Sequence, residues 1–379
     1  MSDPGFGVYL HWPYCSAICP YCDFNVYRPR GAEAEPLLAA IERDVAEHAV
    51  RFGRRPAQSI FFGGGTPSLL SGAEIARLIA GVERAFGLLA SCEITLEANP
   101  EDAARFAEHV SAGVNRLSIG VQALNDADLK ALGRHHGARA ARDAIEAAAR
   151  TGARVSADLI YAREGQSVEA WRAELREALA LPVEHLSLYQ LTIEPETAFA
   201  RKVERGALAP PDADEAASLY EVTEDLCAAH GFPGYEISNY ARTPAAQSQH
   251  NLIYWRSGEW VGAGPGAHGR LAREGVRIAT EAQRRPSDYI DAVREHGVGW
   301  MNETPLTPEQ SGDEILLMGL RVAEGVEVAR IEAMRGSPLD HEALAWLVEQ
   351  GLVTHANGRV ALTRSGRPLA NKIAAELAA

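Results

Sequence analysis

The N-terminal half of the chain alternates short apolar runs with longer segments rich in Ala, Arg and Glu. Runs and segments of these lengths predict strands and helices in turn. The predicted strands are Val8–His11, Ser59–Phe62, Glu93–Glu97, Arg116–Val121, Arg154–Tyr161 and His185–Leu191, and the predicted helices are Glu35–Arg51, Ala73–Phe86, Ala103–Ala112, Ala138–Thr151 and Val168–Leu179. Repeated strand–helix units build a parallel sheet, and six of them make an incomplete (β/α)6 barrel instead of a closed eight-stranded one.

A Pro-rich break at Ala209–Asp212 separates this half from a region of mixed character. A helix is predicted over Asp214–His230 and a strand over Tyr235–Tyr240. From Asp313 onward, three predicted helices precede two short strands joined by an Asn357–Gly358 turn, a strong hairpin signal. These helices are Glu314–Ala323, Val328–Met334 and Leu339–Gln350, and the strands are Leu352–His355 and Arg359–Thr363.

Together these patterns predict an α/β fold in three parts. Residues 1–208 form the incomplete barrel, residues 209–310 form a linking region, and residues 311–379 form a small winged-helix-like module. The second and third parts make an α+β region. Polar motifs follow the ends of the barrel strands, and the carboxyl end of the strands is the face where β/α barrels carry out chemistry.

The chain is acidic, with 51 acidic against 37 basic residues and a formal net charge of −14. Such a surface repels phosphate backbones, so we do not expect nucleic acid as a partner, and the winged-helix-like module is expected to pack without DNA. The first residues lack a basic start followed by an apolar run, and no stretch approaches the length of a membrane-spanning helix. We therefore expect a cytoplasmic protein.

Three of the five cysteines, Cys15, Cys19 and Cys22, lie on one segment immediately after the first predicted strand. In a reducing compartment such a group indicates metal or redox chemistry instead of disulfides. Three thiolates can each bind one iron of a [4Fe–4S] cubane and leave the fourth iron open to a ligand. A zinc site would need a fourth Cys or His at a matching spacing, and His11 is a weak candidate. Three structural buried cysteines are a less favoured alternative.

Polar or glycine residues end four further predicted strands. The run Gly63–Pro67 follows the second strand, while Glu97, Gln122 and Asp158 end the third, fourth and fifth. Each of these residues alone is typical of an ordinary strand end, and a strand-to-helix turn needs one or two glycines. Because the ends of parallel strands meet at one edge of the sheet, the set as a whole predicts one lined pocket.

The cysteine spacing together with these motifs resembles the radical S-adenosylmethionine (SAM) superfamily. The resemblance implies that SAM chelates the open iron of the cluster through its amino and carboxylate groups. Further motifs resemble the coproporphyrinogen-oxidase-like branch, and within it the HemW-type haem chaperones; they are Tyr9–Cys15, Asn115–Gln122, Leu132–His136 and Leu191–Thr197. The SAM contacts implied by the branch are Tyr9, Tyr21, Gly64, Gly65, Thr66, Glu97, Gln122, Arg134 and Asp158. Ala162–Glu164 departs from the family's Gly-Leu-Pro, which puts the local loop shape in doubt.

Two features distinguish the chaperones from the oxidases. The oxygen-independent coproporphyrinogen III oxidases carry a further cysteine where this chain has Phe24, and HemW-type proteins carry the motif His-Asn-x-x-Tyr-Trp. The resemblance implies that this motif contacts haem, through His250, Asn251, Tyr254 and Trp255. On a helix, His250 and Tyr254 share one face. From chemistry alone, a histidine among aromatic side chains is more often a hydrogen-bonded core residue.

The resemblance implies a protein that binds haem and delivers it to an acceptor haemoprotein, with SAM and a [4Fe–4S] cluster as cofactors. It also implies an electron donor of the flavodoxin or ferredoxin type, contact with a membrane surface only through the acceptor, and a homodimer. The main alternative is an oxygen-independent coproporphyrinogen III oxidase, and a third is a radical SAM enzyme with another substrate. No catalytic residue is assigned, and whether the chain cleaves SAM reductively is left open.

Overall fold

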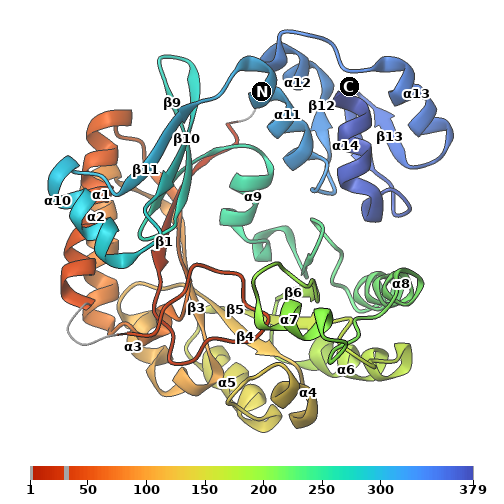
Figure 1. Cartoon of the computed structure of the whole chain (residues 1–379), viewed down its shortest axis with the longest axis horizontal. Helices are drawn as coiled ribbons and strands as arrows, with labels where there is room; N and C mark the ends of the chain where they lie inside the picture. Colours follow the sequence, from red (N-terminus) through yellow and green to blue (C-terminus); the bar gives the residue numbers. More distant parts are fainter. Residues whose placement is uncertain (1–2, 30–33, 379) are drawn as a thin grey trace.

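The computed structural model describes residues 3–29 and 34–378, and its largest element is a sheet of eleven strands (Figure 1). The six predicted strands are present as consecutive parallel neighbours. They are β1 (Phe6–Trp12), β2 (Ala57–Gly64), β3 (Leu88–Ala98), β4 (Arg116–Gln122), β5 (Arg154–Tyr161) and β6 (His185–Gln190). The α/β fold class predicted from the sequence is confirmed.

The sheet extends beyond the six predicted strands at both ends. Strand β7 (Asn239–Ala241) pairs antiparallel with β6, and β8 (Glu259–Ala263) pairs parallel with β1. An antiparallel ribbon of β9 (His268–Arg273), β10 (Val276–Ala282) and β11 (Trp300–Pro305) continues from β8. The sheet therefore crosses the domain boundary predicted at residue 208, although the three-part division itself stays a prediction.

One strand prediction in this region was wrong, and the ribbon was not predicted at all. The strand expected over Tyr235–Tyr240 begins only at Asn239, because Tyr235–Ser238 forms bends around the buried Glu236 carboxylate. Strand β11 exposes five of its six residues and β9 exposes three of its six, and Arg273 of β9 forms an ion pair with Glu303 of β11. Such strands lack the apolar pattern on which a prediction depends.

Helices cover the outer face of the parallel strands (Figure 1). The covering helices are α1 (Ala34–Phe52), α2 (Gly72–Phe86), α3 (Phe106–Ser111), α4 (Asp126–Ala131), α5 (Ala138–Arg150) and α6 (Val168–Ala180). In α5 the buried residues Ala141, Ala144, Ile145 and Ala148 recur at helical spacing and form the stripe that packs on the sheet. The helix predicted over Ala103–Ala112 is divided: Pro100–Arg105 is a 3₁₀ turn, and α3 begins at Phe106.

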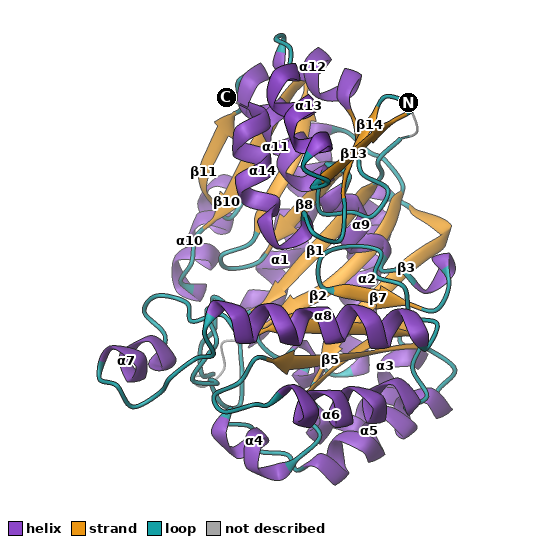
Figure 2. Cartoon of the chain, turned by 90° about the vertical axis from the view of Figure 1, so that its right-hand side faces the viewer, coloured by secondary structure: helices purple, strands orange, loops and turns teal. Residues whose placement is uncertain are grey.

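The remaining helices before the C-terminal part are α7 (Ala198–Glu204), α8 (Ala213–Ala229), α9 (Gln249–Trp255) and α10 (Pro286–His296). Helix α7 projects away from the body of the molecule (Figure 2). In the described parts of the chain, no helix combines the length and apolar composition needed to cross a membrane.

The loop after β5 contains Ala162–Glu164, which stands where the family pattern has Gly-Leu-Pro. Ala162 has a φ of 59°, a left-handed conformation that glycine adopts without strain. The neighbouring Arg163 is buried and forms an ion pair with Asp128 at 2.7 Å and a second one with Glu174. These ion pairs stabilise the loop with side chains that Gly-Leu-Pro does not offer.

The C-terminal residues form a separate small module with its own core. Its elements are α11 (Pro308–Gly319), β12 (Val326–Glu327), α12 (Val328–Arg335), α13 (His341–Glu349), β13 (Val353–Ala356), β14 (Arg359–Leu362) and α14 (Ala370–Ala378). The predicted hairpin is present, and both turn residues, Asn357 and Gly358, have positive φ as its turn requires. Helix α14 was not predicted, although its buried residues Ala370, Ile373, Ala374 and Leu377 recur at helical spacing.

A buried ion pair joins the barrel to the segment that precedes α9. Arg116 of β4 is 1 % exposed and donates to the Glu93 carboxylate of β3 at 2.9 Å. It also donates to the carbonyl of Ala246 at 2.7 Å, and Glu93 accepts from the amide of Gln249 at 2.8 Å. This network fixes the start of α9 against the strands.

We therefore expect Arg116→Met to lower the free energy of unfolding by about 3 kcal/mol, because the buried Glu93 carboxylate then keeps Arg154, at 3.1 Å, but loses the buried Arg116. The matched control is Arg139→Met, since Arg139 is 94 % exposed and should change stability by less than about 0.5 kcal/mol. Denaturant unfolding of both variants measures the difference. Equal effects in the two variants would contradict a stabilising role for the network.

Candidate cluster and SAM site

The cysteine segment after β1 is held by backbone hydrogen bonds to the glycine run after β2. The amide of Gly65 donates to the carbonyl of Trp12 at 2.7 Å, and the amide of Thr66 donates to the carbonyl of Tyr14 at 2.9 Å. Further along, the amide of Cys15 donates to the carbonyl of Tyr27 at 2.9 Å and closes the segment into a loop. The loop is therefore positioned by β1 and β2 together.

This close approach explains why the run consists of glycines. A Cβ atom on Gly65 would lie 2.7 Å from the carbonyl oxygen of Tyr14 and 2.9 Å from the carbonyl carbon of Pro13. Gly64 has a φ of 107°, which side chains rarely adopt, and a Cβ there would meet the ring of His11 at 2.4 Å. The glycines are thus required by the packing of the cysteine loop, whatever ligand the site takes.

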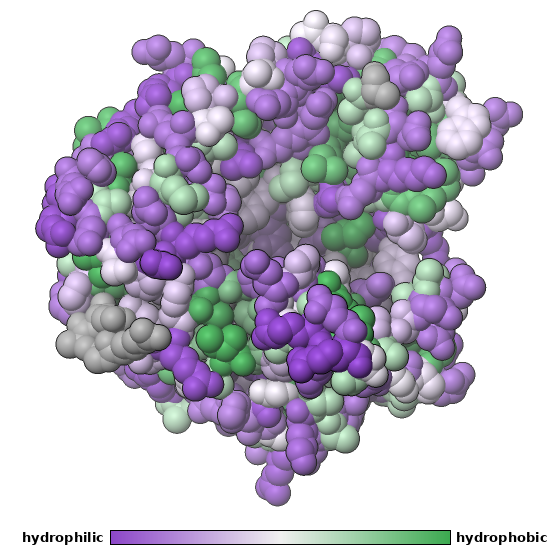
Figure 3. All heavy atoms as spheres, in the orientation of Figure 1, coloured by the Kyte–Doolittle hydropathy of each residue, from purple (hydrophilic) through white to green (hydrophobic). Residues whose placement is uncertain are grey.

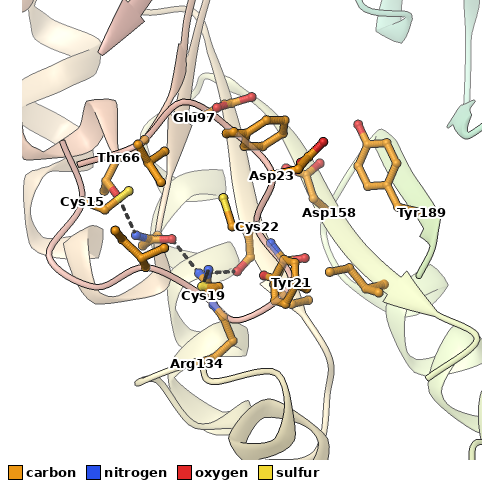
Figure 4. A pocket seen from close by; sticks show the side chains of 18 of the residues that line it. Cys15, Cys19, Tyr21, Cys22, Asp23, Thr66, Glu97, Arg134, Asp158 and Tyr189 are labelled. Atoms are coloured by element: carbon orange, nitrogen blue, oxygen red, sulfur yellow. Dashed lines mark hydrogen bonds between the residues drawn. The ribbon is translucent and has the colours of Figure 1, made fainter. Parts of the chain in front are cut away.

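The three thiols line one cavity of about 320 Å³ at the carboxyl ends of the strands (Figure 4). Eight of the nine residues implied as SAM contacts line the same cavity; they are Tyr21, Gly64, Gly65, Thr66, Glu97, Gln122, Arg134 and Asp158. Figure 3 shows that this side of the molecule is hollowed near its centre. The strand-end residues that the sequence placed together are therefore together in the structure.

The donor set is three thiols without a fourth protein ligand. Among the described residues, no three His, Cys, Asp or Glu side chains converge closely enough to hold one metal ion. A single zinc ion needs such convergence, whereas in a cubane each thiolate binds a different iron. Burial raises the pKa of the Cys15 thiol, and raises that of Cys22 to about 11. The thiols fit a cluster whose irons displace the thiol protons.

Arg134 lies beside the cysteine loop and connects it to two strand ends. Its guanidinium donates to the sulfur of Cys19 at 3.4 Å, to the side-chain oxygen of Asn99 at 2.6 Å and to the carbonyl of Gly120 at 3.3 Å. Arg134 therefore ties the cysteine loop to the ends of β3 and β4.

Two half-buried carboxylates face the opposite side of the cavity. Glu97 accepts the amide of Gly64 at 3.1 Å, and Asp158 accepts the hydroxyl of Ser118 at 2.9 Å. Burial, and secondarily the charge of Asp158, raises the pKa of Glu97 to about 8, and burial raises the pKa of Asp158. Neither carboxylate has an ion-pair partner among the described residues. A cationic ligand would stabilise both in their charged form, and SAM carries an ammonium and a sulfonium.

Gln122 owes its place in the cavity to the backbone. Its φ is 65°, and the register between β4 and β5 shifts between Gly120 and Gln122. A left-handed residue at the end of a strand turns its side chain away from the strand's regular alternation. The sequence placed Gln122 at a strand end but contains no signal for this conformation.

Tyr9 is the implied SAM contact that does not line the cavity. Its hydroxyl is 3.0 Å from Nδ1 of His11, whose Nε2 is 2.9 Å from the carbonyl oxygen of Asn25 in the cysteine loop. Tyr9 therefore contacts the cysteine loop indirectly, through His11. Conversely, Asn99, Ser118 and Tyr189 line the cavity and were not predicted as site residues, although Asn99 and Tyr189 lie near the ends of predicted strands.

The residues implied as haem contacts lie on α9, apart from the cavity that contains the thiols. His250 is 2 % exposed, and its Nδ1 is 2.8 Å from the hydroxyl of Ser59. Its ring stacks on Phe61 with centroids 5.0 Å apart and meets Tyr254 edge-on at 4.6 Å. Burial lowers the pKa of His250 to about 3. These are the surroundings of a neutral core histidine, and the role of His250 as a haem ligand stays a prediction.

The other motif residues differ from His250 in their surroundings. Asn251 and Tyr254 are half-buried, and Trp255, at the end of α9, lines a second cavity with residues of the C-terminal module. The four side chains therefore do not converge on one exposed surface.

Two family models match the sequence. The radical SAM superfamily matches residues 9–178, and the HemN C-terminal domain matches residues 306–369. The chain is 34% identical to the heme chaperone HemW of Bacillus subtilis, over 96% of this chain and 97% of that protein. It is 41% identical to the heme chaperone HemW of Escherichia coli, over 76% of each chain. It is 40% identical to the mitochondrial radical S-adenosyl methionine domain-containing protein 1 of Bos taurus, over 84% of this chain and 74% of that protein.

Among solved structures, the coproporphyrinogen III oxidase HemN of Escherichia coli, described as a radical SAM enzyme, shares the fold. The TM-score is 0.83 with 22% sequence identity, over 99% of this chain and 90% of that chain. At this identity the likeness concerns the fold alone.

The arrangement of the thiols predicts which cysteines carry iron. After anaerobic reconstitution, Cys19→Ala should lose the iron and sulfide that the wild-type chain retains, because two thiolates cannot hold a cubane. Cys92→Ala is the matched control, since Cys92 is buried away from the cavity. The iron and sulfide content per chain is measured in both variants. A Cys19→Ala variant with as much iron and sulfide as the wild type would contradict the assignment of Cys19 as a cluster ligand.

The raised pKa of Glu97 predicts a pH-dependent stability in the cluster-free protein. The pKa of this carboxyl is about 8 in the folded chain and about 4.5 in the unfolded chain. Between these pH values the folded chain keeps the proton and the unfolded chain loses it. Stability should therefore fall as the pH rises from about 4.5 towards 8, and the fall should be smaller in Glu97→Gln. Thermal unfolding at pH 6 and pH 8 measures this change, with the exposed Glu349→Gln as control. An equal pH effect in wild type and Glu97→Gln would refute it.

Proposed function

Because this chain belongs to the HemW family of radical SAM proteins, we propose that it binds haem and delivers it to acceptor haemoproteins. The observation that carries the proposal is the similarity to the heme chaperone HemW of Bacillus subtilis, which spans almost the whole of both chains. The cavity lined by three thiols supports it, because a radical SAM protein needs such a donor set.

The residues of this cavity suit the two cofactors of the family. Cys15, Cys19 and Cys22 would hold a [4Fe–4S] cluster, and the lining residues between Glu97 and Asp158 would hold SAM. When bound, the pair supplies a 5′-deoxyadenosyl radical by reductive cleavage of SAM. The protein's own contribution is to keep two uncompensated carboxylates opposite the thiols, so that the cationic ligand is oriented between them.

Arg134 would connect the two halves of this site. It contacts Cys19 on one side and Asn99 on the other, and Asn99 Nδ2 in turn lies 3.3 Å from the hydroxyl of Thr66. These contacts would couple the position of the cysteine loop to the SAM side of the cavity. We propose that occupation of the cluster and SAM site controls haem transfer in this way.

The partners follow from the same proposal. A flavodoxin or ferredoxin-type protein would supply the electron to the cluster, and an acceptor haemoprotein would receive haem. A homodimer and a cytoplasmic location, with contact to a membrane only through the acceptor, complete the proposal.

The coproporphyrinogen III oxidase activity is the second candidate, because the fold is shared with HemN. The side chain of Phe24 argues against it. Phe24 lines the mouth of the cavity and is 62 % exposed, at the position where the oxidases carry a further cysteine. A phenyl ring offers neither a metal ligand nor an acid–base group for a reaction at the cluster.

One anaerobic experiment distinguishes the two candidates. The reconstituted protein is titrated with haem while the Soret band is followed, and the same preparation is incubated with SAM, a reductant and coproporphyrinogen III. We expect saturable binding of one haem per chain and no protoporphyrinogen. If the protein converts coproporphyrinogen III and shows no saturable haem binding, the chaperone function is wrong and the oxidase activity is correct.

A further inference from the structure

The cysteine loop is held at its far end by a second glycine-rich segment, Gly262–Gly269, which spans the end of β8 and the start of β9. The contact is made by Asn25, three residues after Cys22. The side-chain nitrogen of Asn25 donates to the carbonyl of Pro265 at 2.9 Å and to the carbonyl of Arg284 at 2.8 Å. Both protons of this amide are therefore used, and both bind backbone that lies outside the six barrel strands.

The glycines of this segment are required by the same contact. A Cβ atom on Gly266 would lie 2.6 Å from Nδ2 of Asn25, and one on Gly264 would lie 2.3 Å from the carbonyl oxygen of His11. Both glycines have positive φ, 110° at Gly264 and 79° at Gly266. A dinucleotide-binding glycine run would follow a strand and open a helix, whereas this segment joins two strands. The segment is therefore shaped to receive the cysteine loop.

The backbone around Asn25 is held as well as its side chain. The carbonyl oxygen of Asn25 is 2.9 Å from Nε2 of His11, and the hydroxyl of Tyr27 donates to the carbonyl of Arg284 at 3.1 Å. The amide of Cys15 donates to the carbonyl of Tyr27 at 2.9 Å and joins this end of the loop to the first cysteine. Asn25 thus lies where the cysteine loop meets the extension of the sheet.

The residue before Asn25 contacts a cysteine sulfur. The backbone amide of Phe24 donates a hydrogen bond to the sulfur of Cys22. Hydrogen bonds to the sulfur ligands of an iron–sulfur cluster raise its reduction potential, because reduction adds negative charge to the sulfurs and a donor stabilises that charge. The direction of the Phe24 amide depends on the backbone that Asn25 anchors.

We propose that Asn25 is a positioning residue for the [4Fe–4S] cluster, and that its hydrogen bonds to the carbonyls of Pro265 and Arg284 keep the Phe24 amide on the sulfur of Cys22. This inference rests on the cluster of the proposed function and adds a residue that controls it. It also gives the extension of the sheet a part in the chemistry, since the segments after β8 and β10 supply the two acceptors.

The test replaces the amide by a side chain of the same branched shape. Asn25→Leu is neutral and similar in volume, but it donates no hydrogen bond. After anaerobic reconstitution of the full-length chain, the midpoint potential of the cluster is measured by a redox titration that is followed by electron paramagnetic resonance. At the same applied potential we expect an about tenfold lower ratio of reduced to oxidised cluster in the variant, a shift of about −59 mV for a one-electron couple. Asn302→Leu, at an exposed asparagine of β11, is the matched control and should leave the potential unchanged.

A second variant disturbs the same contact from the other side. Gly266→Ala leaves the sequence of the cysteine loop unchanged, and its Cβ forces the Asn25 side chain to move, so the potential should shift in the same direction. Circular dichroism and thermal unfolding of the cluster-free variants show whether each is folded, and if Asn25→Leu is misfolded, Gly266→Ala decides. A folded Asn25→Leu chain that no longer retains iron and sulfide would also support the inference, because the loop is then misplaced.

The inference and the proposed function are tested separately. If Asn25→Leu and Gly266→Ala both keep the potential of the wild type, Asn25 serves only the packing of the loop and this inference is wrong. The same wild-type preparation is titrated with haem, and saturable binding beside unchanged potentials would leave the proposed function standing. If the wild type retains no iron and sulfide, the cluster assignment fails and the inference fails with it.

Discussion

The hydrogen bonds between the glycine run and the cysteine loop are the constraint on which the candidate site depends. The amides of Gly65 and Thr66 donate to the backbone just before Cys15, and no side chain fits between the two segments. The loop could not be held in this way by strand β1 alone, because its thiols lie beyond the end of the sheet. Pairing β1 with β2 in parallel register brings the two segments together at the same edge. The position of the thiols is therefore a consequence of sheet topology.

The same topology separates opposite charges across the cavity. Arg134 lies on the side of the thiols, and Glu97 and Asp158 lie on the other side, each held by a short hydrogen bond from a neighbouring strand. Partial burial without a cationic partner disfavours the charged form of both carboxyl groups and raises their pKa values. Strained and uncompensated groups concentrate where a protein binds its ligands, and this cavity combines both, since Gln122 also adopts a left-handed backbone.

Helix α9 connects this cavity with the C-terminal module. On its inner face, His250 packs among aromatic rings beneath the strands, and its first residues are fixed by the Arg116–Glu93 ion pair. At its far end, Trp255 and Arg256 border the second cavity. Helix α9 thus packs against the strands of the barrel at one end and borders the second cavity at the other. The residues of this motif therefore have different surroundings, with His250 packed in the core and Trp255 lining a cavity.

The sequence alone determined the six parallel strands, the cysteine trio and the grouping of Glu97 and Asp158, because apolar periodicity and strand-end position are properties of neighbouring residues. It also determined the Asn357–Gly358 hairpin. The tertiary structure decided that β8 and the ribbon of β9, β10 and β11 extend the sheet, since their place in it is set by pairing with strands distant in the sequence. It likewise decided that His250 is buried. Burial and charge balance depend on residues that are distant in the chain, and packing alone brings these residues together.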